Sequence, residues 1–157
     1  MRLIKRQSAG IWMTLVTLIL AIASFVIYNV NIHSAGYFEN ASSPYAVNYL
    51  VIAMVLMVVA IVIAQIPVKG IADKIATLLA DAARIAAPAL CVAAAITLVS
   101  SRVQGFAFIY FSNEEVLQEV QTAANMSSSH GAIASIVALF VTAIIGMVAA
   151  FFRVKKK

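Results

Sequence analysis

Four long runs of apolar residues alternate with short polar segments along this chain. They cover about residues 9–30, 46–66, 82–101 and 131–152. A helix needs roughly 20 mostly apolar residues to cross the hydrocarbon of a bilayer, so each run is long enough to span it. Backbone polar groups in lipid must be paired within the segment, which predicts that each run is a helix. The expected fold is an all-α bundle of four transmembrane helices, forming one domain over residues 1–157.

The third run differs from the others because charged residues stand at its start. Its uncharged part begins at Ile85, directly after Asp81 and Arg84. These two are three residues apart, a spacing that lets them pair on one helical face. Pro88 removes one backbone hydrogen bond, which predicts a kink near Arg84. This polar face is interpreted as the solvated start of a helix, with a docking face for a cytoplasmic partner as the alternative.

Composition supports a membrane protein. Apolar residues make up 64% of the chain and the mean hydropathy is +1.01. A soluble domain of this length could not bury so much apolar surface, so the lipid bilayer is the expected partner. The formal net charge is +5, but the basic residues gather at the ends of the apolar runs. That distribution argues against a nucleic-acid partner.

The distribution of lysine and arginine predicts the orientation. The two chain ends and the segment between the second and third runs hold ten of the eleven basic residues and two acids, a charge of +8. The other two loops hold one basic residue and four acids, a charge of −3. The positive-inside rule therefore places both termini in the cytoplasm and the protein in the cell membrane. Alternatively, the first run is a signal peptide cleaved after Ala23, although it continues to Val30, beyond the length such a signal needs.

Small residues predict how the helices pack. Lipid tails are as apolar as leucine, so helices in a bilayer associate where small side chains allow close approach. In the fourth run, residues four apart form a seam of small side chains: Ala134, Ala138, Thr142, Gly146 and Ala150. This seam is expected to pack within the chain, against the alanine-rich third run. Self-association of two copies is the alternative.

The segment SSRVQGFAFIYFSNEEV, residues 100–116, has two interpretations. In the first, the third helix ends near residue 101 and Arg102 lies in the headgroup zone, about 27 Å from Arg84 along a helix. The aromatic residues then anchor an outer loop, and together with Arg102 they become candidate contacts for a partner: Phe106, Phe108, Tyr110 and Phe111. In the second, the helix continues to Phe111 with Arg102 facing inward. We favour the first. Ser112 and Glu115 then form a capping box for a short amphipathic helix over residues 113–125.

Candidate chemistry is sparse. The interiors of the first, second and fourth runs hold no ionisable residue, unlike those of ion-coupled transporters. No nucleophile–base set, glycine-rich phosphate loop or paired cysteine motif is present, and Cys91 is expected to be an inert buried thiol. His33 and His130 could join Glu39 in a metal site, but their spacing matches no ligand pattern. We therefore expect no enzymatic activity, no metal and no cofactor.

Three features together resemble a group of small, uncharacterised four-span membrane proteins of Gram-positive gut bacteria. They are SAGYFEN after the first run, SSRVQGFAFIYF after the third, and an acidic loop that leads to a serine-rich start of the fourth. The resemblance implies a link to sugar-uptake systems and no activity. The leading hypothesis is a non-catalytic accessory subunit that binds another membrane protein. The alternative is a small oligomeric channel, a holin-like pore or a solute carrier.

Overall fold

The computed structural model describes residues 8–66 and 70–153. Over these residues the chain forms five helices and no strand. They are α1 (Ala9–His33), α2 (Pro44–Gln65), α3 (Ile71–Phe111), α4 (Glu114–Val120) and α5 (Ala123–Ala150). All except α4 are long and apolar enough to cross a membrane. The predicted four-helix bundle of a multi-pass membrane protein is therefore confirmed. Pro67 directly follows the second apolar run and, because proline disfavours helix in the residue before it, predicts the end of that helix; it lies outside the described residues.

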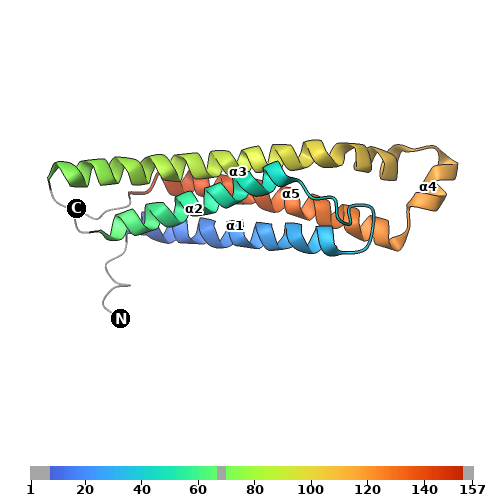
Figure 1. The fold of residues 1–157 in the computed structure, drawn as a ribbon, viewed down its shortest axis with the longest axis horizontal. Coiled ribbons are helices and arrows are strands. Elements are labelled where there is room, and N and C mark those ends of the chain that lie inside the picture. Colours follow the sequence, from blue (N-terminus) through green and yellow to red (C-terminus); the bar gives the residue numbers. More distant parts are fainter. Residues whose placement is uncertain (1–7, 67–69, 154–157) are drawn as a thin grey trace.

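The four long helices form a closed ring. Neighbouring pairs around the ring are α1 with α2, α2 with α3, α3 with α5, and α5 with α1. Successive long helices run in opposite directions (Figure 1). Ser8 and Arg153 therefore lie at the same end, here called the terminal end. The opposite end carries α4 and is called the cap, comprising residues 34–43 and 105–131. The close packing expected between the third and fourth spans is present as the pair α3 and α5.

The third helix is much longer than predicted. It runs without a break from Ile71 through Pro88 to Phe111, 41 residues or about 61 Å. The favoured end near residue 101 was wrong, and the alternative continuation to Phe111 is what the structure has. Ser112 does not cap the next helix, because its hydroxyl donates to the Phe108 carbonyl oxygen at 2.7 Å and so completes the last turn of α3. The predicted capping box is therefore absent.

The acidic helix is shorter, and the last helix longer, than predicted. Two side-chain caps explain both changes. Asn113 accepts a hydrogen bond from the Val116 amide at 3.0 Å and begins α4. Thr122 accepts one from the Asn125 amide at 3.2 Å and begins α5 eight residues before the expected start at 131. Each satisfies an amide that would otherwise lack a partner in the first turn.

The buried positions of the helices alternate in steps of four and three residues. In α1 the series is Gly10, Thr14, Thr17, Ala21, Ser24, Tyr28 and Asn31, with Ile32 buried beside it. In α5 the series is Ser128, Ala132, Ser135, Leu139, Thr142, Gly146 and Ala149, with Ser129 and Ala143 buried beside it. A repeat of seven residues with two buried positions is the pattern of helices that coil around one another with a left-handed twist. Most of these side chains are small or hydroxylated, so α1 and α5 approach closely.

The buried positions of α3 follow the same alternation through both arginines. After Arg84, steps of four and three lead through Pro88, Cys91, Ala95, Leu98, Arg102, Gly105 and Ile109. Residues on such a series share one face of a helix. Arg84 and Arg102 therefore both lie on the face of α3 that turns into the bundle.

Candidate functional site

Two buried arginines on α3 are the charged groups that stand out in the bundle. Arg84 is 4% exposed and Arg102 is 3% exposed. Ionisable side chains inside membrane proteins are expensive to bury and usually mark a structural or functional centre. The two lie 18 residues apart, about 27 Å along the helix, so they stand near opposite ends of the membrane-sized part of the bundle.

Arg84 joins three helices at the terminal end. Its Nε donates to Thr14 Oγ1 at 2.9 Å, and its Nη1 donates to the Phe152 carbonyl oxygen at 2.8 Å. Its Nη2 donates to the carbonyl oxygen of Ala149 and, at 3.4 Å, to that of Gly10. Arg84 therefore connects α3 with the first turns of α1 and the end of α5.

These contacts give Arg84 a structural role. Ala149 lies in the last turn of α5 and Phe152 two residues beyond its end, where carbonyl oxygens lack the regular helical partner. The Ala149 carbonyl oxygen also accepts from the Phe152 amide at 3.1 Å. A cation at this end also suits the helix dipole. The Asp81 carboxylate, whose side chain is 48% exposed, lies 3.5 Å from Arg84 Nη1, so the pairing expected from their spacing is present. The expected solvated polar face was wrong for Arg84, because its side chain points into the bundle.

Arg102 has far fewer partners. Its Nη2 donates to the Ala41 carbonyl oxygen, and its guanidinium carbon lies 4.8 Å from the centre of the Phe38 ring, a cation–π contact. Its buried Nε has no hydrogen-bond acceptor. No carboxylate of the described residues forms an ion pair with Arg102. The expected exposure of Arg102 to lipid headgroups was wrong, because the loop between α1 and α2 folds over this side chain and covers it. Its expected level near the outer edge of the membrane stays a prediction.

The covering loop, residues 34–43, is held at both ends. Gly36 and Asn40 have φ angles of +136° and +57°, a region that favours glycine and tolerates asparagine. The Phe38 amide donates to Ser128 Oγ at 3.0 Å, and the Ser43 amide donates to the Tyr28 hydroxyl at 2.6 Å. These bonds fix the loop against α5 and α1, so Phe38 stays above Arg102.

Two of the four aromatic residues proposed for partner contact turn inward. Phe106 packs edge-on against Phe38, with ring centres 5.4 Å apart. The Tyr110 hydroxyl accepts a hydrogen bond from Ser129 Oγ at 2.9 Å. Both residues are only partly exposed and help to hold the cap together.

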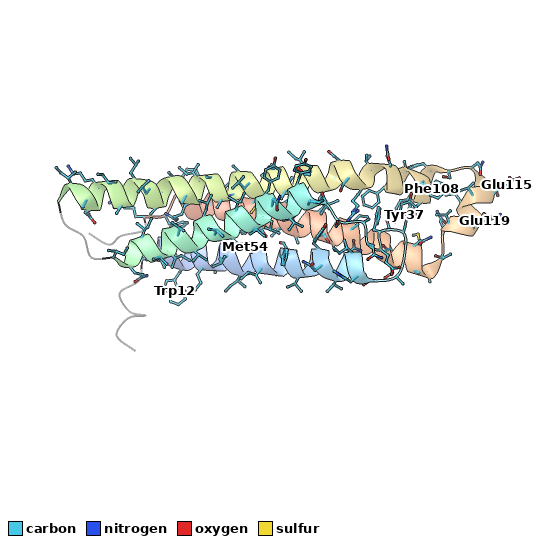
Figure 2. All side chains as sticks on the ribbon, viewed as in Figure 1. Trp12, Tyr37, Met54, Phe108, Glu115 and Glu119 are labelled. Atoms are coloured by element: carbon cyan, nitrogen blue, oxygen red, sulfur yellow. The ribbon has the colours of Figure 1, made fainter. Side chains whose placement is uncertain are left out.

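The other two aromatic residues face outward. The rings of Phe108 and Tyr37 lie 5.8 Å apart on the outside of the cap (Figure 2). Phe111, at the end of α3, is 84% exposed. We call Tyr37, Phe108 and Phe111 the aromatic patch. The role of this patch in partner contact stays a prediction.

The predicted seam of the fourth run is divided between the interior and the surface. Thr142 and Gly146 are buried, Ala138 and Ala150 are partly exposed, and Ala134 is exposed. Thr142 Oγ1 lies 3.0 Å from Ser24 Oγ of α1. A Cβ at Gly146 would lie 3.0 Å from atoms of both Thr17 and Pro88. The central part of the seam therefore packs within the chain, as expected.

The described helices leave little space where they pack together. Two small pockets between them each measure about 10 Å³, roughly the space of one water molecule. Among the described residues, no group of three histidine, cysteine or acidic side chains could hold a metal ion. His33 and His130 are both exposed, and Nδ1 of His33 lies 2.7 Å from the Asn29 carbonyl oxygen.

The burial of Arg84 was missed although the sequence carries a signal for it. Read in steps of three and four, the small residues Ala80, Ala87, Cys91 and Ala94 place Arg84 on the same face. The signal for Phe38 is weaker, because its role depends on how the loop crosses the bundle.

Comparison of the chain with protein-family models, with curated proteins and with solved structures finds no match.

Proposed function

We propose that this chain is a non-catalytic accessory subunit that binds another membrane protein through the aromatic patch of its cap. The observation that carries the proposal is the exposed position of Phe111 on a bundle whose interior is otherwise closed. Large exposed apolar groups mark contact sites more often than isolated small ones do. Aromatic residues also supply much of the binding energy at the centres of interfaces.

Helix geometry favours a patch that extends beyond the lipid. If Arg84 and Arg102 stand near the two edges of the hydrocarbon, Phe108 and Phe111 lie about 9 and 13 Å beyond the second edge. The headgroup region there adds only about 6 Å. Phe108 can then act as an interfacial anchor, whereas Phe111 reaches water, where a partner could cover it. The basic residues at the chain ends support a cytoplasmic terminal end and an external cap.

The charges around the patch suggest the chemistry of the partner. Glu114, Glu115 and Glu119 are exposed on α4, beside the end of α3 (Figure 2). A matching surface would offer an apolar pocket for Phe111 and basic side chains at its rim, since complementary charges select the partner and speed association. A transporter is one candidate, and the resemblance of the sequence points to sugar uptake.

An oligomeric channel, holin-like pore or solute carrier is the second candidate function. A path through one copy is disfavoured because the interior voids are of single-water size. A pore would have to form between copies. Solute flux in liposomes that contain the purified protein would favour this candidate.

Site-specific photocrosslinking tests the leading proposal. A photoreactive phenylalanine analogue at position 111 should give a discrete crosslinked product in the native membrane. The same analogue at Ile19, which is exposed on α1 within the membrane-sized region, is the control. Phe111→Ser should abolish co-purification of the captured protein without lowering the unfolding temperature, because Phe111 makes little contact within the chain. Equal labelling at both positions would contradict the proposal.

A further inference from the structure

An apolar groove opens on the surface of the bundle between α3 and α5, at the terminal end. Ile85 and Pro88 line it from α3, and Met147, Ala150 and Phe151 line it from α5. Its volume is about 480 Å³, within the range of sites that hold small molecules. Phe151 is 90% exposed at its end. The groove faces the region where lipid tails surround the helices, so a hydrocarbon chain is the natural occupant of its apolar part.

The groove has a fixed shape. Arg84 holds the end of α5 against α3 through its bonds to the carbonyl oxygens of Ala149 and Phe152. One turn along, Gly146 lets α5 approach Pro88 closely, since a Cβ there would lie 3.0 Å from the Pro88 Cβ. The contacts of Arg84 and Gly146 therefore hold α3 and α5 together next to the groove. The groove keeps its shape without an occupant.

An exposed cation close to the end of the groove favours an anionic headgroup. Arg153 is exposed and follows Phe151, a lining residue, by two positions. The end of a helix normally repels an anion, but Arg84 donates to the Ala149 and Phe152 carbonyl oxygens. The Asp81 carboxylate is paired with Arg84. The charge of Arg153 is therefore left to attract an anionic headgroup.

We propose that this groove is a binding site for one anionic phospholipid, with an acyl chain along Ile85, Met147 and Ala150 and the phosphate beside Arg153. A second copy of the chain is a poorer occupant. In a symmetric pair it would bring its own Arg153 close to this one, and like charges placed together oppose association. The proposal is independent of the function proposed for the cap.

Lipid binding to the full chain in a neutral detergent tests this site. Phosphatidylglycerol and phosphatidylcholine with identical acyl chains are added in separate samples, and bound lipid is counted by native mass spectrometry. The unfolding temperature is followed with a thiol-reactive dye, because Cys91 is the single cysteine and is buried in the native protein. We expect one phosphatidylglycerol per chain and a higher unfolding temperature with it than with phosphatidylcholine.

Variants separate the headgroup contact from the groove. Arg153→Gln should weaken phosphatidylglycerol binding about fivefold, the change expected from losing one cation near an anionic headgroup, and leave phosphatidylcholine unaffected. Ala150→Phe fills the groove and should abolish the bound lipid. Ile85→Phe narrows it from the opposite wall and serves if Ala150→Phe fails to fold. Val137→Phe adds a ring at a lipid-exposed position of α5 outside the groove and should bind as the unaltered chain does.

Three results would overturn the proposal. The first is equal stabilisation by the two lipids. The second is retention of phosphatidylglycerol by folded Ala150→Phe and Ile85→Phe. The third is a doubled mass in light scattering that Phe151→Ala returns to that of one chain, which would show that a second copy occupies the groove.

Discussion

The two buried arginines of α3 share one helix and nearly the same burial, but their surroundings differ. Arg84 donates to four oxygen atoms from α1 and the end of α5, and a carboxylate lies within ion-pair distance. Arg102 donates to one loop carbonyl, sits over one aromatic ring and leaves its Nε without an acceptor. A buried charge stabilises a fold only when its neighbours replace the water it has lost.

This difference assigns distinct roles to the two ends of the bundle. At the terminal end, backbone segments lie in close contact, and the guanidinium of Arg84 adds hydrogen bonds to carbonyl oxygens at the ends of α1 and α5. At the cap, a loop and aromatic side chains surround Arg102, and the contact is less complete. We therefore expect the terminal end to resist change and the cap to adapt, which suits a surface that docks onto a partner.

The largest expected effect comes from Arg84→Met. Methionine is similar in length but donates no hydrogen bond. The Phe152 carbonyl oxygen would lose the donor Arg84 Nη1, and the Ala149 carbonyl oxygen would keep only the Phe152 amide. Removing one side of a buried polar network is strongly destabilising, and we expect a loss of about 3 kcal/mol. Reversible unfolding in mixed micelles measures the free energy of unfolding, with Cys91 labelling as the readout.

Asp81→Asn is the control for the Arg84 prediction. The Asp81 side chain is about half exposed, and an exposed ion pair contributes little, so this variant should cost about 0.5 kcal/mol. A large loss for Asp81→Asn with a small one for Arg84→Met would mean that the ion pair, and not the helix-end hydrogen bonds, stabilises the terminal end.

A matched pair of glycine variants compares the two ends directly. A Cβ at Gly10 would lie 2.5 Å from the Arg153 carbonyl oxygen, which is backbone. A Cβ at Gly105 would lie 2.5 Å from Phe38 Cε1, which belongs to a side chain. Backbone cannot rotate away, so Gly10→Ala should cost about 3 kcal/mol and Gly105→Ala about 1 kcal/mol in the same unfolding assay. The reverse order would contradict the view that the cap is the adaptable end.

The helices were largely predictable because the physics of the bilayer acts locally. A spanning helix needs about 20 apolar residues and paired backbone groups. These two requirements predict both ends of α1, both ends of α2 and the last residue of α5 to within a few residues. The early start of α5 was missed because Thr122 caps it within a polar segment, where hydropathy gives no signal.

The site was less predictable because it depends on contacts between distant segments. Arg102 was placed in the headgroup zone by counting along α3, which treats the arginine as if it faced lipid or water. Its burial comes from Phe38 and Ala41, some 60 residues earlier, in a loop whose path no local pattern encodes. Arg84 was within reach, since its position in the buried series of α3 follows from spacing alone.

Of the two arginine variants, Arg102→Met should have the smaller effect. Replacing an incompletely paired buried charge by an apolar side chain of similar size is often neutral or stabilising, so the free energy of unfolding should change by less than about 1 kcal/mol. Hydrogen exchange should rise in the loop around Phe38 and Ala41, because the bond from Arg102 Nη2 is lost, while the Ser43 amide stays protected by its bond to Tyr28. If Arg102→Met instead costs as much as Arg84→Met, the two arginines are equivalent supports and the cap is not the adaptable end. If loop exchange is unchanged, the bonds of the loop to α1 and α5 are sufficient to hold it, and Arg102 would be present for a contact that the isolated chain does not make.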